Sequence, residues 1–276
     1  MAWRELLVAL LAGIVQGVFE WLPISSQGNL SMLFTALGES GETALALSLF
    51  LHLGTTIAAT VYYREDIRAA SEGISAWRPR AAFAAGNAEP SFVLIASVTT
   101  GLVGVPLYLL AVDLASAVSG GVFVAAVGVL LILTGVVQRT SDAVGLGERE
   151  LPTFADAVFV GAAQAFAILP GVSRSGMTTS VLLFEGYDGP AAFRLSFLLS
   201  IPAGLGATAL VVLDAGGLPE IGVAAGAIAL TASVLVGYLT IDLLLGVVER
   251  VPFWAVCFGL GALALLGGGV VIVVGG

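Results

Sequence analysis

The residues best suited to chemistry in this sequence lie in two short polar stretches within apolar segments. In the first, Gln16 and Glu20 are four positions apart, which places both side chains on one face of a helix. The stretch continues with hydroxyls and amides at Ser25, Ser26, Gln27 and Asn29. A carboxylate beside such groups could manage a proton, a water molecule or a bound cation.

The second stretch, PGVSRSGMT at 170–178, holds Arg174 among small and hydroxyl-bearing residues. Glycine lets backbone approach a ligand closely, and a helix that begins near Ser175 would point its positive end at the same place. A guanidinium, hydroxyls and a helix N-terminus together favour a phosphate or another anion. The alternative is an arginine at the cytosolic edge that pairs with an acid.

Together the two stretches supply the groups that phosphoryl transfer needs. Arg174 would stabilise charge, a hydroxyl would attack, and Glu20 or a bound metal would manage the proton or the water. Serines alone indicate little, because in apolar helices they mostly bond to backbone. His52, the only histidine, could add acid–base chemistry, although such a residue is more often a hydrogen-bonded core residue.

The elements that must position these residues are apolar helices in a membrane. Of the 276 residues, 58% are hydrophobic and 11% charged, against about 25% charged residues in a soluble domain. Runs such as VLLILTGVV (129–137) do not alternate as strands of a membrane barrel would. Six spans long enough to cross a bilayer fall near 43–63, 92–112, 118–138, 192–213, 221–246 and 253–275. The net charge is −9, and no basic cluster suggests a nucleic-acid partner.

Two further apolar segments, 5–37 and 155–187, are interrupted halfway by LPISSQGN and LPGVSRSGMT. Neither half can span alone, so we predict two re-entrant helical hairpins. Broken backbone at membrane depth is tolerated where it is buried in protein or lines a wet cavity. An ionised Glu20 at mid-membrane costs about 2.5–3.5 kcal/mol on insertion scales, so it should face such a cavity. The alternative is a position near a helix end, from which it reaches the interface.

An internal repeat relates the two interrupted segments. At an offset of 148 residues the matched pairs include Gly13 and Gly161, Gln16 and Gln164, Ser25 and Ser173, and Ser48 and Ser196. Three predicted spans separate the copies, so the second is inverted and the two hairpin tips can meet near the midplane. The sequence therefore predicts a single all-α membrane domain over 1–276, with inverted repeats at approximately 5–112 and 155–246 and 118–138 as an intervening span. This topology suits a transporter or an enzyme that acts on a lipid.

Arginines predict the side of the membrane on which each loop lies. The loop 64–91 carries Arg64, Arg68, Arg78 and Arg80, so the positive-inside rule makes it cytoplasmic. The segment 139–156, two spans later, holds Arg139 and Arg149 and falls on the same side. Both termini are then expected outside.

The residues QGVFEWLPISSQG (16–28) and PGVSRSGMT (170–178) resemble the undecaprenyl-diphosphate phosphatase family that is linked to bacitracin resistance. The resemblance covers nearly the whole chain. It implies a hydrolase of the plasma membrane that removes the terminal phosphate of a C55-type polyprenyl diphosphate and so recycles the lipid carrier for envelope glycan synthesis. It also implies six spanning helices with two re-entrant hairpins in an inverted repeat, a homodimer, and a site open to the outer face.

The family's motifs assign roles to residues of this sequence. Its (E/Q)xxxE motif falls on Gln16 and Glu20, its proposed serine nucleophile on Ser26, and its phosphate-binding arginine on Arg174. The resemblance thus implies that Glu20, Ser26 and Arg174 are catalytic. The expected substrate-binding residues are Gln16, Ser25, Gln27, Asn29, Ser173, Ser175, Gly176 and Thr178.

One position departs from the family pattern: where the family commonly has histidine, this chain has Asn29. Asparagine cannot exchange protons near neutral pH. Either Glu20 alone manages the proton, or His52 substitutes, or activity is low. A requirement for Mg²⁺ or Ca²⁺ fits the family, with Glu20 as the candidate ligand, although one carboxylate makes a poor cation site.

A rival function is transport, in which the protein would flip a polyprenyl monophosphate across the membrane. The inverted repeat supports this function equally, and Arg174 would still bind the anion. Transport would not need Ser26 as a nucleophile. The sequence leaves open the physiological lipid and the choice between serine and water as the attacking group.

Overall fold

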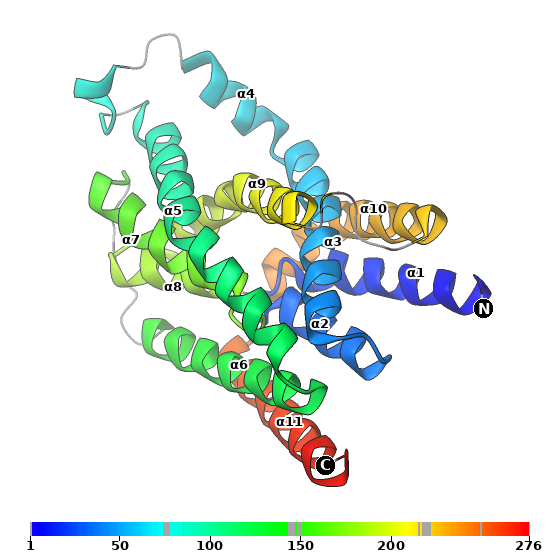
Figure 1. The fold of residues 1–276 in the computed structure, drawn as a ribbon. Helices are drawn as coiled ribbons and strands as arrows, with labels where there is room; N and C mark the ends of the chain where they lie inside the picture. The colour runs from blue at the N-terminus through cyan, green and yellow to red at the C-terminus, as the bar shows by residue number, and fades with distance from the viewer. Residues whose placement is uncertain are drawn as a thin grey trace.

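The computed structural model describes residues 2–73, 78–84, 86–142, 147, 149, 151–214, 216, 222–248 and 250–275. Within these residues the secondary structure is helical and contains no strand, as predicted. Helices that are distant in the sequence pack against one another around the centre of the molecule (Figure 1).

Six helices are long and apolar enough to cross a membrane, in agreement with the six predicted spans. They are α3 (Gly41–Tyr62), α5 (Ala88–Ala117), α6 (Gly120–Asp142), α9 (Gly189–Asp214), α10 (Val223–Val248) and α11 (Phe253–Gly275). The largest difference is at α5, which extends beyond the predicted 92–112 at both ends. Position 221, at the start of the predicted 221–246 span, lies outside the described residues.

Shorter helices make up the two interrupted segments. They are α1 (Ala2–Phe19) and α2 (Ser26–Ala36) in the first, and α7 (Phe154–Ala165), the one-turn helix η3 (Phe166–Ile168) and α8 (Arg174–Phe184) in the second. In each, a serine caps the helix after the break. The Ser25 hydroxyl oxygen accepts from the Gly28 N–H at 3.1 Å, and the Ser173 oxygen accepts from the Gly176 N–H at 3.2 Å. Repeat-related serines thus cap both helices with the same hydrogen bond, although only Ser25 has a positive φ.

The two interrupted segments have equivalent neighbours. Figure 1 shows α1 running along α10, and α7 packs in the same way along α5. Likewise α2 packs on α3, and α8 packs on α9. Since the 148-residue offset matches α1 with α7 and α2 with α8, these contacts are what a two-fold repeat would produce. The re-entrant path and the inverted orientation stay predictions.

Small residues allow α6 and α11 to approach closely, as is common between membrane helices. A Cβ atom added to Gly128 would lie 2.7 Å from the Gly261 carbonyl oxygen, and one added to Gly261 would lie 2.7 Å from that of Gly128. Neither position has room for a larger side chain without moving the backbone. The helices α6 and α11 lie side by side at the edge of the bundle (Figure 1).

The predicted hydrophilic loop 64–91 contains α4 (Arg64–Gly73), which extends from the end of α3 (Figure 1), and the one-turn helix η2 (Pro79–Ala81). Arg194 on α9 pairs with Glu89 at 2.5 Å and with Asp66 at 3.1 Å, which ties this loop to α9. Residues 74–77 and 85 of this loop, and residues 143–146, 148 and 150 of the predicted 139–156 segment, lie outside the described residues.

Candidate active site

The breaks of the two segments contact each other directly. Besides capping α2, the Ser25 hydroxyl oxygen accepts a hydrogen bond from the Gly171 N–H at 3.2 Å. The backbones are so close that a Cβ on Gly28 would lie 2.6 Å from the Gly171 nitrogen. Ser25 and Gly171 both have positive φ, 58° and 105°, which turns the chain sharply at each break. The first residues of α2 and α8 are thereby brought together.

Glu20 lies at the centre of the site and is 7% exposed. Its Oε1 is 3.1 Å from a terminal nitrogen of Arg174. Its Oε2 accepts hydrogen bonds from the Ser26 hydroxyl at 2.8 Å and from the Gln16 amide at 2.9 Å. A buried carboxylate needs such partners. The predicted carboxylate, hydroxyl and guanidinium are therefore in direct contact, although 154 positions separate Glu20 from Arg174.

His52 also faces Glu20, with its Nε2 3.3 Å from Oε2. Its Nδ1 lies 2.8 Å from the Ser48 carbonyl oxygen. If Nδ1–H donates to that carbonyl, Nε2 can donate to Glu20 only as part of the protonated ring. The predicted accessory histidine is thus placed where a proton could pass between it and the carboxylate.

The Arg174 guanidinium is held from two sides. One terminal nitrogen donates to the Ser196 carbonyl at 3.1 Å, and the other reaches Glu20. The Ser196 hydroxyl lies 2.6 Å from that of Thr178 on α8, which fixes α8 against α9. Arg174 is also the first residue of α8, so its charge adds to that of the N–H groups at the positive end of the helix.

Ser48 and Ser196 are a matched pair of the repeat, and each carbonyl oxygen lies within hydrogen-bond distance of a side chain of the site. The Ser48 carbonyl orients His52 within α3, and the Ser196 carbonyl of α9 orients Arg174 of α8. The offset of 148 residues aligned these serines but gave no reason to assign them a role. A backbone acceptor carries no side-chain signal, so sequence alone could not reveal it.

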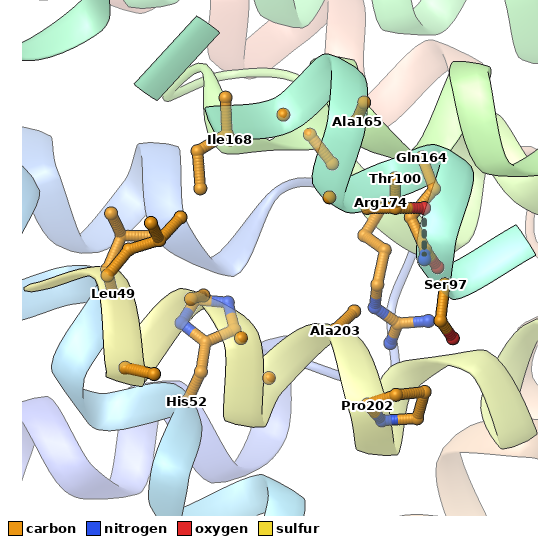
Figure 2. A pocket seen from close by; sticks show the side chains of 18 of the residues that line it. Leu49, His52, Ser97, Thr100, Gln164, Ala165, Ile168, Arg174, Pro202 and Ala203 are labelled. Atoms are coloured by element: carbon orange, nitrogen blue, oxygen red, sulfur yellow. Dashed lines mark hydrogen bonds between the residues drawn. The ribbon is translucent and has the colours of Figure 1, made fainter. Parts of the chain in front are cut away.

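The site opens into a cavity of about 300 Å³ whose lining includes Glu20, His52 and Arg174. Figure 2 shows His52 and Leu49 on one side of it and Arg174 with Thr100 and Gln164 on the other. A smaller hollow of about 20 Å³ lies between the two breaks. Its polar lining consists of Glu20, Ser25, Ser26, Gln27, His52, Ser173, Arg174 and Ser175.

Four of the expected substrate-binding residues are absent from the linings described for these two cavities: Gln16, Asn29, Gly176 and Thr178. Gln16 supports Glu20, and Thr178 supports Ser196. The Asn29 amide donates to the carbonyls of Ile24 and Ser25, at 2.8 and 2.9 Å. Asn29 therefore stabilises the turn before α2, and the imidazole that lies beside Glu20 is that of His52.

The residues of the site do not form a cation cage. Mg²⁺ and Ca²⁺ prefer several oxygen ligands, and among the described residues no group of three or more His, Cys, Asp or Glu side chains could hold a metal. Both oxygens of Glu20 are already engaged by protein groups. No catalytic step is therefore assigned to a metal.

Comparisons with known proteins show the family of this chain. The family model described as bacitracin resistance protein BacA matches residues 9–263. A protein of Haloarcula marismortui named undecaprenyl-diphosphatase is 48% identical over 96% of this chain and 98% of its own length. Proteins of the same name from Methanococcoides burtonii and Methanopyrus kandleri are 40% and 39% identical, over 94% and 95% of this chain and 96% of each relative. The chain therefore belongs to the BacA bacitracin-resistance family.

Proposed function

We propose that this protein hydrolyses a polyprenyl diphosphate of the undecaprenyl type to the monophosphate and inorganic phosphate, and so recycles a lipid carrier for envelope glycan synthesis. The observation that carries the proposal is the contact of Glu20 with both Ser26 and Arg174 at the base of a cavity between membrane helices. The relatives named undecaprenyl-diphosphatase support the same reaction.

Each group has a defined task in this reaction. The incoming terminal phosphate would compete with Glu20 for the Arg174 guanidinium, which then stabilises the charge on the transferring group. Attack by the Ser26 oxygen would form a serine–phosphorus bond, break the bond to the bridging oxygen and release the lipid monophosphate. The serine proton would pass to Glu20 Oε2, 2.8 Å away. Water would then cleave the phosphoserine. In the alternative, water attacks directly, Glu20 takes its proton and Ser26 positions it.

The cavity also offers a place for the lipid tail. Beyond the polar groups its walls are formed by α5 and α9, with small or apolar residues such as Gly104, Ala207 and Leu210. Tight contact with an isoprenoid requires walls of this kind. The tail would therefore lie between α5 and α9, and the diphosphate would point toward Arg174.

The protein is a multi-pass membrane protein, and we place it in the plasma membrane with its site open to the outer face, because the arginine-rich loop 64–91 is expected inside. A homodimer is the assembly we expect from the family. Mg²⁺ or Ca²⁺, if required, would enter as a counter-ion of the diphosphate, since Glu20 is the only carboxylate named in the cavity linings above.

The direct test is phosphate release by the purified, full-length protein from polyprenyl diphosphates of several chain lengths, with and without a chelator. We expect release, and we expect long isoprenoids to be preferred because more of the α5–α9 wall is covered. An absence of release, with Arg174→Ala behaving identically, would contradict the proposal. Movement of a lipid monophosphate across proteoliposomes without release would instead indicate a transporter.

His52 is expected to contribute to catalysis and Asn29 to folding. Replacing His52 by glutamine should lower kcat about a hundredfold, the effect of losing a proton-transfer group, and should change the pH–rate profile. Replacing Asn29 by alanine should leave kcat nearly unchanged and lower the midpoint of thermal unfolding, because two side-chain bonds to the turn are lost. Kinetics and unfolding of the two variants check this, and the reverse ranking of kcat would show that Asn29 acts in the chemistry.

A further inference from the structure

Gln164, the repeat partner of Gln16, lines the cavity and carries an unpaired side-chain oxygen that the reaction above does not use. Among the described residues, three buried side-chain atoms have no hydrogen-bond partner, and one of them is Gln164 Oε1. Gln164 is only 3% exposed, and it lines the same cavity as Arg174. A buried polar atom without a partner is costly, so this side chain is suited to receive one from a ligand.

The neighbours of Gln164 form a polar collar, defined here as Ser97, Thr100, Gln164 and Ser200. The Gln164 amide donates to the Thr100 hydroxyl oxygen at 3.0 Å, the bond drawn in Figure 2. Figure 2 also places Ser97 and Arg174 on this side of the cavity, opposite His52 and Leu49. The collar is thus made by three elements, α5, α7 and α9, that meet beside the guanidinium.

The collar lies between the catalytic groups and the apolar walls. Along α5, Ser97 and Thr100 come before Gly104 and Val105. Along α9, Ser200 comes before Ala207 and Leu210 in the same way. A lipid diphosphate has the same order of parts: a terminal phosphate, a phosphate attached to the lipid, and an isoprenoid chain. With the terminal phosphate at Arg174 and the chain along the apolar walls, the lipid-side phosphate falls at the collar.

The chemistry of Gln164 suits an anion, whereas that of Gln16 does not. Gln16 Nε2 donates to Glu20, so turning its amide would place an oxygen against the carboxylate. Gln164 contacts a hydroxyl, which can accept or donate. The Thr100 hydroxyl now has the carbonyl oxygens of Ala96 and Gly161 as acceptors, at 2.8 and 2.9 Å. After a half-turn of the amide, it would turn to donate to Oε1, and the Gln164 NH₂ group would take the place of the unpaired oxygen as a donor to a phosphate oxygen.

We propose that Gln164, supported by Thr100, binds the lipid-side phosphate and thereby makes the site selective for a diphosphate over a monophosphate. This proposal rests on the proposed function for the identity of the ligand. Gln164 is a specificity residue in it, and the bonds that form and break remain at Ser26, Glu20 and Arg174.

The test compares two non-hydrolysable lipids with the same isoprenoid tail, a methylene bisphosphonate and a monophosphonate, bound to the full-length protein. Gln164→Leu should raise the Kd of the bisphosphonate about tenfold or more, because a hydrogen bond to a charged group is lost. The Kd of the monophosphonate should stay unchanged, because its single charged group binds at the Arg174 guanidinium, a stronger anion partner than a neutral amide, and so does not occupy the collar. Thr100→Val should also raise the Kd of the bisphosphonate. Thr99→Val is the matched control, since its hydroxyl bonds to the Ile95 carbonyl and Thr99 is absent from the lining described for the cavity.

The outcomes separate this proposal from the proposed function. An equal loss of affinity for both ligands in Gln164→Leu, or no loss of affinity for either, would overturn the subsite. If Gln164→Leu does not fold, the same comparison of the two Kd values in Thr100→Val decides the question. A loss of affinity for the bisphosphonate alone supports the subsite even if the wild-type protein releases no phosphate. In that case the hydrolase function fails while the diphosphate subsite stands.

Discussion

Replacing Arg174 by alanine is expected to reduce phosphate release at least about a thousandfold, the smallest effect typical of an arginine that stabilises a transferring phosphoryl group. The guanidinium is 3.1 Å from both Glu20 and the Ser196 carbonyl, so its position is fixed before substrate arrives. An arginine held in this way can meet the charge of the transition state without first becoming ordered. Initial rates on a polyprenyl diphosphate, measured in detergent with protein of confirmed monodispersity, check the prediction.

Two further variants show whether the loss comes from the site. Arg174→Lys keeps the charge but cannot reach Glu20 and Ser196 through a planar fork, so an intermediate rate is expected. Arg194→Ala removes an arginine of α9 that pairs with Glu89 and Asp66 instead of with Glu20. This variant should retain activity. If the folded Arg174→Ala variant shows less than about a tenfold fall in the rate of phosphate release, the arginine does not act on the transferring phosphate.

The spanning helices could be predicted because hydrophobicity and length decide them. A segment such as 118–138 is apolar throughout, and water cannot satisfy its backbone in lipid, so it must be helical. The helix ends were less predictable. α5 begins at Ala88 and continues to Ala117, beyond the predicted 92–112, because a charged residue such as Asp113 ends an apolar run without ending a helix.

The groups that we propose as catalytic could be picked out from the sequence because their residue types are unusual in apolar surroundings. Glu20 and Arg174 each stand out within an apolar segment, and the repeat placed them on facing breaks. The position of His52 beside Glu20 was not predictable to the same degree. Only the packing of α3 against the first break places its ring 3.3 Å from Glu20, while Asn29, nine positions from Glu20 in sequence, turns toward the backbone.

Gln164 shows what repeat analysis could have added. Its match with Gln16 was visible in the sequence, but the two side chains have different neighbours, since α1 packs on α10 and α7 on α5. The same residue type therefore supports a carboxylate in one copy and lines the cavity in the other. A repeat indicates which positions correspond, and the partners of each copy decide what they do.

Replacing Glu20 by glutamine is expected to lower kcat by about a hundredfold to ten-thousandfold, the range for losing a general base. Glutamine keeps the size of the side chain and a polar contact with Ser26, but it cannot take the serine proton. Ser26→Ala should cause a loss of similar size if the hydroxyl attacks. Since the two groups would act as one unit through the 2.8 Å hydrogen bond, the double variant should be no slower than the slower single variant.

The same pair of variants distinguishes the two attacking groups. With Ser26 as the nucleophile, a phosphoserine should form, and Glu20→Gln should slow its hydrolysis, so that the intact protein quenched during turnover carries one added phosphate that Ser26→Ala lacks. With water as the nucleophile, no phosphate attaches, Ser26→Ala retains more activity than Glu20→Gln, and the two losses become partly additive. A Glu20→Gln variant with full activity would contradict both mechanisms, because the carboxylate accepts the proton in each.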